Sequence, residues 1–340
     1  MLSNTLSIQQ LRNIASRVIF IHSIALGLLA CGAAGSDVQE NQAFRVALLT
    51  PGPISDQSWN AAAYEGLGRI RDSLGAQVRH VQTRTPAEFE ENYRQYGAAQ
   101  YSLVIGHGFE FQEAAQRVAP EFPQTIFATT GGTGTAANVA ALSFAFDEPS
   151  YLAGMAAAGV SRSKVLAVIG GTELPPVRAS FDAFVAGAMA VDSSVTVLTA
   201  FIGNWEDAGA GKEQALALIA RRADVIFQNA DAAGQGIFQA VREARGVWII
   251  GSNANQNDVA PLVTLGSVVI DIPHAFVLLA REIQDGSFTP RVVRFTTASD
   301  VVRWVPNPAV APGSASLAAR IDTVRAAFAE GRGPTLVPTP

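Results

Sequence analysis

Short apolar runs alternate with amphipathic segments along the chain from residue 44 onward. The apolar runs are rich in β-branched residues and predict strands at 44–50, 77–83, 102–107, 124–130, 138–144, 164–170, 194–203, 223–228 and 247–251. Amphipathic segments between them predict helices, such as those at 60–75, 86–100, 213–222 and 237–245. Continuous apolar strands that alternate with helices are typical of parallel sheets covered on both faces. The pattern therefore predicts an α/β fold with two doubly wound lobes, the second beginning near residue 149.

Loops that follow the strands are the places to seek function, because ligands of such sheets lie beyond the carboxyl ends of the strands. Two of these loops hold a tryptophan between short polar residues, Trp59 after the first strand and Trp205 after a strand of the second series. A single loop tryptophan can simply cap the core of its own lobe. Two in matching loops favour a cleft that sandwiches a planar ligand, with stacking worth about 1–3 kcal/mol per face. Micromolar affinity needs about 8 kcal/mol, so polar side chains must contribute as well.

The first 30 residues have the layout of a secretory signal peptide. Arg12 and Arg17 precede an apolar run at 18–30, and this run leads directly into Cys31. The residues Leu-Leu-Ala-Cys at 28–31 resemble the bacterial lipobox, in which the cysteine thiol is acylated. We therefore expect a signal peptide over 1–30, a lipidated linker over 31–43, and an exported protein that Cys31 anchors to a bacterial membrane, facing the periplasm or the cell exterior. A retained anchor helix is the alternative.

Composition and charge exclude several classes of function. The 340 residues include 24 basic and 29 acidic side chains, and loss of residues 1–30 would leave 22 basic residues and a net charge of −7. An acidic chain with two lysines is a poor partner for nucleic acid or nucleotide phosphates. The four histidines and one cysteine have no metal-ligand spacing, and no phosphate-loop, dinucleotide or hydrolase motif fits its required context. We therefore expect neither a metal ion nor a cofactor.

Several short motifs occur together in this chain. They are D-x-S-W-N at 56–60 with Y-E-G-L at 64–67, G-H-G-F at 106–109, P-S-Y-L-A-G at 149–154, G-G at 170–171, A-D-V-I-F-Q at 223–228 and E-G at 330–331. With the lipobox, they resemble the basic membrane lipoproteins, which are PnrA-like substrate-binding proteins of ABC importers. The resemblance implies a type I periplasmic binding protein fold, capture of a purine nucleoside or purine nucleobase, delivery to a membrane permease, and action as a monomer.

The same resemblance implies how the chain is divided between two lobes joined by three crossovers. We expect an N-terminal lobe over 44–146 and about 253–272. We expect a C-terminal lobe over 147–252 and about 273–310, followed by a C-terminal helix and tail over 311–340.

The D-x-S-W-N motif supplies the first part of the implied ligand-binding set. Trp59 and Trp205 each stand where family members commonly have the phenylalanine that stacks on the base, and tryptophan enlarges that π-face. Beside Ser58, Asp56 would offer an acceptor and Asn60 an amide to the edge of the base. Alternatively, Asp56 and Asn60 bond turn amides and cap the helix that follows.

The loops that follow other strands supply the rest of the set. Phe109 would pack beside the ligand or in the core, and Asp231 would accept from an exocyclic amine or sugar hydroxyl, or lie exposed in a turn. Asn253 and Asn255 stand where nucleoside-binding members usually have aspartates that hold ribose, and Ile270 stands where a lysine is expected. A neutral asparagine bonds a hydroxyl more weakly, by about 1 kcal/mol. A free nucleobase therefore competes with a nucleoside as the expected ligand.

Functions of other classes stay open on the sequence alone. The cleft could take another flat heterocycle such as a flavin, or the chain could be a surface lipoprotein with a role outside transport. An enzyme related to nucleoside hydrolases would use Asp56 and Asp231, although no motif points to one.

Overall fold

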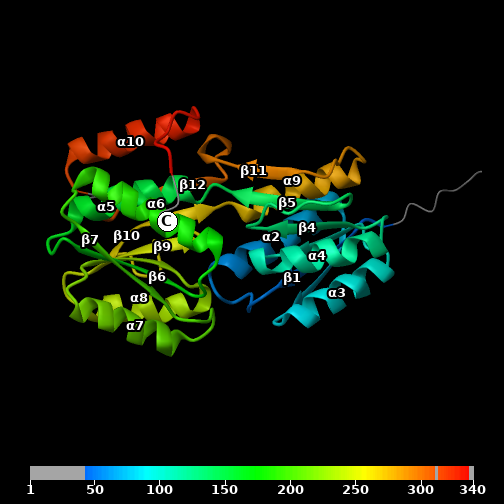
Figure 1. The fold of residues 1–340 in the computed structure, drawn as a ribbon, viewed down its shortest axis with the longest axis horizontal. Coiled ribbons are helices and arrows are strands. Elements are labelled where there is room, and N and C mark those ends of the chain that lie inside the picture. Colours follow the sequence, from blue (N-terminus) through cyan, green and yellow to red (C-terminus); the bar gives the residue numbers. More distant parts are fainter. Residues whose placement is uncertain (1–42, 311–312, 337–340) are drawn as a thin grey trace, which may run out of the picture. The chain divides into compact units, whose positions relative to one another are not determined.

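The computed structural model describes residues 43–310 and 313–336, so the expected signal peptide and Cys31 lie outside the described residues. From Phe44 onward the chain forms one compact unit that contains two six-stranded sheets. Each sheet has helices on both of its faces (Figure 1). The predicted α/β fold with two doubly wound lobes is thus confirmed.

The first lobe is built on a sheet with the strand order β11-β5-β4-β3-β1-β2, and every paired strand in it is parallel. Its strands are β1 (Arg45–Thr50), β2 (Gln77–Gln82), β3 (Leu103–Gly106), β4 (Ile126–Thr130), β5 (Val139–Phe144) and β11 (Val292–Phe295). The central strands are buried almost throughout, because helices cover both of their faces. This burial explains why they are continuous apolar runs in the sequence.

The second lobe repeats this plan with the order β12-β10-β9-β8-β6-β7. Only the β10–β12 pair is antiparallel among the described strands. Its strands are β6 (Val165–Gly170), β7 (Thr196–Phe201), β8 (Val225–Asn229), β9 (Trp248–Asn253), β10 (Thr264–Ile270) and β12 (Val302–Pro306).

Helices pack in pairs against the two sheets. The first lobe has α2 (Trp59–Leu74), α3 (Pro86–Ala98), α4 (Gln112–Val118) and α9 (Ile272–Gln284). The second has α5 (Asp147–Val160), α6 (Pro175–Val191), α7 (Ala208–Ala220) and α8 (Gly234–Glu243), with α10 (Ala315–Ala329) packed on α5. Short 3₁₀ turns are η1 (Phe109–Phe111), η2 (Ala119–Glu121), η3 (Asp231–Ala233) and η4 (Thr297–Ser299).

Three crossovers join the lobes, but the last part of the chain is divided differently from the sequence expectation. The assignment of 253–272 to the N-terminal lobe was wrong, because β10 pairs with β9 and β12 in the second sheet. The assignment of 273–310 to the C-terminal lobe was wrong in part, because α9 packs on α2 and β11 pairs with β5. Strand β10 is apolar and buried like any central strand, so its sequence does not reveal which sheet it joins.

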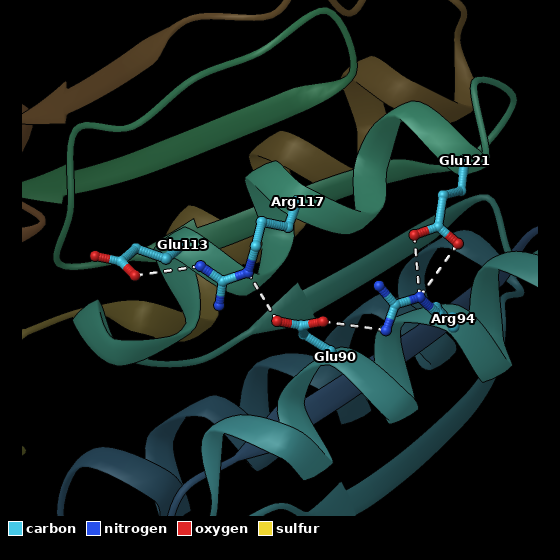
Figure 2. A network of polar contacts seen from close by, with 5 residues as sticks. All are labelled: Glu90, Arg94, Glu113, Arg117 and Glu121. Carbon is cyan, nitrogen blue, oxygen red and sulfur yellow. Dashed lines mark hydrogen bonds and ion pairs between the residues drawn. The ribbon is translucent and has the colours of Figure 1, made fainter.

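An ion-pair network holds α3 against α4 and η2 (Figure 2). Glu90 lies at its centre and bonds Arg117 at 2.7 Å and Arg94 at 3.1 Å. Arg117 also reaches Glu113, and Arg94 reaches Glu121. The two arginines hold the pKa of Glu90 below its usual range. Because these side chains are partly or largely exposed, each pair contributes little to stability, and the network mainly links the three elements at the surface.

Candidate ligand-binding site

One cavity is lined by residues of both lobes, where the strands of the two sheets end. Its wall is mostly aromatic and apolar, with two carboxylates and two amides, and among the described lining residues none is lysine, arginine or histidine. The lining residues are Pro51, Trp59, Gly108, Phe109, Glu110, Gly131, Phe144, Phe146, Leu174, Pro176, Val177, Trp205, Asn229, Asp231, Asn253 and Ile270. The arrangement suits an uncharged, flat and largely apolar molecule that carries a few polar groups.

Trp59 contributes an indole from the first residue of α2. His107 stacks on the indole, with the ring centroids 4.0 Å apart and the planes 23° from parallel. The His107 Nε2 lies 3.0 Å from the Trp59 carbonyl oxygen, and its Nδ1 lies 3.1 Å from the Thr130 hydroxyl. The histidine therefore fixes both the backbone and the ring of Trp59. Burial lowers the pKa of His107 to about 3, so the imidazole is neutral at pH 7.

The buried His107 makes the protein sensitive to acid. An unfolded histidine binds a proton near pH 6.5, whereas the folded one resists it, so the free energy of unfolding falls as the pH drops below 6.5. Between pH 6.5 and 5 this loss is about 2 kcal/mol. We expect a His107→Gln variant to lack this part of the pH dependence in urea unfolding, whereas the exposed His274→Gln control keeps it. A difference between wild type and His107→Gln that stays constant over this pH range would contradict the assignment.

Trp205 lines the cavity from the second lobe, in the loop after β7. Its ring lies over Gly171, where an added Cβ would overlap the indole. Its carbonyl oxygen accepts a hydrogen bond from the Ala233 backbone N–H at 2.9 Å. The Gly-Gly pair after β6 thus leaves the space in which this indole packs, which gives the motif at 170–171 a physical reason.

The other residues of the D-x-S-W-N motif do not line the cavity. Both carboxylate oxygens of the buried Asp56 accept local hydrogen bonds, from the backbone N–H groups of Ser58, Asn60 and Ala61 and from the Asn60 amide, at 2.8–3.0 Å. Asp56 and Asn60 therefore close the start of α2, as the capping alternative predicts. Because neither side chain lines the cavity, this geometry does not support the predicted hydrogen bonds from Asp56 and Asn60 to the edge of a base.

Loss of the Asp56 carboxylate is expected to act on stability. An Asp56→Ala variant leaves three backbone N–H groups at the start of α2 without their acceptor, and we expect it to lower the free energy of unfolding by about 2 kcal/mol. Urea denaturation measures this, and the exposed Asp72→Ala variant in the same helix provides the control, with no expected change. An unaltered midpoint for Asp56→Ala would contradict the capping role.

Asn253 and Asp231 form a buried polar cluster in the cavity wall. The Asn253 Nδ2 lies 3.2 Å from Asp231 Oδ1 and 3.3 Å from both Asn229 Oδ1 and the Ser58 hydroxyl. Asn253 and Asp231 both have left-handed backbone, with φ of 65° and 48°, a conformation that is costly and tends to occur at functional sites. Burial first, then the charges of Asp56 and Glu110, raise the pKa of Asp231 well above its usual range.

The two lobes are also hydrogen-bonded to each other beside the cavity. The Ser58 hydroxyl donates to the Ser252 carbonyl oxygen at 3.2 Å, and the Gln256 amide donates to the Gln57 carbonyl oxygen at 3.3 Å. A further bond joins the Gln82 amide to Glu206 at 3.2 Å. Ser58 therefore connects the lobes and does not belong to the wall.

Five of the eight sequence-predicted binding residues thus meet at the cavity: Trp59, Phe109, Trp205, Asp231 and Asn253. Sequence reasoning missed Glu110, although this residue directly follows the G-H-G-F motif in the loop after β3. It also missed Phe144, the last residue of β5, and Phe146, which directly precedes α5, because neither carries a polar signal. Ile270, where a lysine was expected, adds apolar surface to the wall.

The part of the chain that the structure describes contains neither a membrane-spanning helix nor a metal site. No helix within it combines the length and apolar character needed to span a bilayer. No group of three or more His, Cys, Asp or Glu side chains within it could hold a metal ion.

One protein family matches most of the chain. The family described as "ABC transporter substrate-binding protein PnrA-like" matches residues 43–310. A nucleoside-binding protein of an ABC transporter from Lactococcus lactis is 29% identical over 260 residues, which are 71% of this chain and 74% of the relative. A purine-binding protein of Brucella abortus is 24% identical over 283 residues, which are 82% of this chain and 79% of that protein.

Among solved structures, a solute-binding protein of an ABC transporter system from Aeropyrum pernix superposes with a TM-score of 0.79. The match covers 85% of this chain and 92% of the other, at 20% sequence identity. At this level of sequence identity the similarity shows the fold alone, and this fold agrees with the periplasmic binding protein architecture expected from the motifs.

Proposed function

The chain belongs to the family of PnrA-like substrate-binding proteins of ABC transporters, and we propose that it captures a purine nucleoside or a purine nucleobase. The observation that carries the proposal is the cavity wall, in which an indole from each lobe meets buried amides and carboxylates. The names of the Lactococcus and Brucella relatives support the same class of ligand.

The energetics of the wall favour a stacked ligand held by a few polar groups. Two indoles contribute about 2–6 kcal/mol by stacking, and burial of a flat heterocycle between apolar side chains adds to this. Hydrogen bonds between the ligand and polar groups such as Asp231 and Asn253 provide the remainder and the orientation. A phosphate group would meet two acidic side chains, and no described lining residue is lysine, arginine or histidine. The proposed ligand is therefore not a nucleotide.

Delivery to a permease and attachment to the membrane complete the proposal. We propose that residues 1–30 direct export, that Cys31 becomes acylated, and that the linker tethers a monomeric receptor to the membrane surface. Closure of the two lobes around the ligand would present one shape to the permease.

Calorimetric titration of the purified protein with adenosine, guanosine, inosine, adenine, AMP and riboflavin tests this function. We expect at least one nucleoside or nucleobase to bind with micromolar or tighter affinity, and AMP to bind at least tenfold more weakly. Tightest binding of AMP or riboflavin, or no purine binding by correctly folded protein, would overturn the proposal.

A further inference from the structure

Glu110 is a carboxylate in the cavity that neither motif nor resemblance assigned a role. It lies in η1, directly after Phe109, and lines the cavity from the first lobe. Gly108 makes room for it, because a Cβ at that position would overlap the Glu110 carboxylate. The loop after β3 is thus built so that this side chain lies against the cavity.

The Glu110 carboxylate has hydrogen-bonding capacity to spare. Across residues 43–310 and 313–336, no other residue forms a side-chain hydrogen bond or an ion pair with it. Its neighbours on α3 and α4 behave differently, since Glu90 and Glu113 are both paired with Arg117. An ionised carboxylate can accept about four hydrogen bonds, and within the described residues the backbone N–H of Glu110 itself is the one protein donor that acts on it. Most of its capacity is therefore open to donors on a ligand.

The charges around Glu110 also favour a ligand that donates hydrogen bonds. Asp231 lies in the same wall on the opposite lobe, and its pKa is raised partly by the charges of Glu110 and Asp56. His107 beside the wall is neutral, and no described lining residue carries a positive charge. Burial raises the pKa of Glu110 itself. A ligand that brings N–H donors relieves this acidic pair, whereas one that brings only acceptors adds to the repulsion.

We propose that Glu110 determines specificity by accepting a hydrogen bond from an amino group on the bound heterocycle, so that the cavity selects aminated purines. This inference rests on the proposed function of the cavity and names the class of purine it takes. Trp59 and Trp205 hold any flat ring, whereas Glu110 distinguishes rings by the donor at their edge. Asp231, which already accepts from Asn253, has less capacity for this task.

Ligands that differ only in the amino group provide the test. Calorimetry at pH 7.5 compares adenine and 2-aminopurine with unsubstituted purine, and compares adenosine with purine riboside, in case ribose is needed for binding. The wild-type protein is expected to bind at least one aminated ligand about tenfold or more tightly than its unsubstituted counterpart.

Two substitutions at Glu110 separate the effect of its charge from the effect of its hydrogen-bond acceptor. Glu110→Gln keeps the size and one acceptor oxygen but removes the charge, and we expect the preference to fall to about threefold. Glu110→Met also removes the acceptor, and we expect it to abolish the preference while stacking still binds the unsubstituted ring. Glu113→Gln is the matched control, because Glu113 is exposed and pairs with Arg117 outside the cavity; it should keep the wild-type preference. Thermal melts verify that each variant is folded.

The outcomes separate this inference from the function on which it rests. If the wild-type protein binds purines without preference for an amino group, or if both Glu110 variants keep the preference, the role of Glu110 is wrong and the purine receptor stands. If the folded wild-type protein binds none of these ligands, both proposals fall.

Discussion

Replacing Trp59 and Trp205 together by alanine is expected to weaken purine binding by about 1000-fold. Each indole lines the cavity from a different lobe, and stacking on one base face is worth about 1–3 kcal/mol. Two losses of about 2 kcal/mol each give about 4 kcal/mol, or three orders of magnitude in Kd. Each single variant is expected to lose about 30-fold, and each phenylalanine variant should retain most of the affinity because the π-face remains.

Calorimetry on these variants needs a control for the general loss of an indole. Trp248→Ala serves this purpose, because Trp248 begins β9 and so lies at the far end of the strand from Asn253, which reaches the cavity. We expect this variant to lose stability without losing affinity. If the double cavity variant binds a purine as tightly as the wild type, the ligand does not lie between the indoles.

A methyl group added at Gly154 is expected to lower the free energy of unfolding by about 3 kcal/mol or more. Gly154 lies in α5, and an added Cβ would overlap the carbonyl oxygen of Phe184 in α6. Gly187 in α6 faces the Tyr151 carbonyl oxygen in the same way. The helices therefore pack with their backbones in close contact, and a backbone oxygen yields less readily than a flexible side chain.

Thermal unfolding measures the effect of Gly154→Ala, with an expected fall of about 5 °C or more in Tm. The matched control is Gly68→Ala in α2, where an added Cβ meets nothing within 4 Å; alanine there should stabilise the helix by about 1 kcal/mol. Equal effects at the two positions would contradict the close contact between α5 and α6. The contact also bears on the site, because α6 begins beside Leu174 and carries Pro176 and Val177 of the cavity wall.

The sequence pattern predicted the architecture because its signals are local. Short β-branched apolar runs such as those of β3 and β8 favour strands, and their alternation with helices leaves few ways to bury them. The assignment of segments to lobes failed at β10 and α9 because it depends on pairing between distant strands. Strand β10 joins β9 and β12 through ladder hydrogen bonds that no local pattern encodes.

The site residues that could be predicted are those whose role follows from their place after the end of a strand. Trp59 and Trp205 could be chosen because they follow the carboxyl ends of strands, and both line the cavity. Asp56 could not be assigned in the same way, because a carboxylate in a loop serves a cap or a ligand according to which N–H groups surround it. Glu110 was missed because its place in the cavity wall, without a basic partner, is visible only in three dimensions.

A purine held between the two indoles of the cavity is the basis of the proposed function. The most direct measurement offers the purified protein an equimolar mixture of adenine, adenosine, guanosine, AMP, riboflavin and glucose, separates bound from free ligand by rapid gel filtration, and identifies the bound compound by mass spectrometry. We expect the wild-type protein to retain a purine nucleobase or nucleoside, and the Trp59→Ala, Trp205→Ala double variant to retain none. Retention of riboflavin, glucose or AMP in its place, or equal retention of a purine by both proteins, would contradict the proposed function.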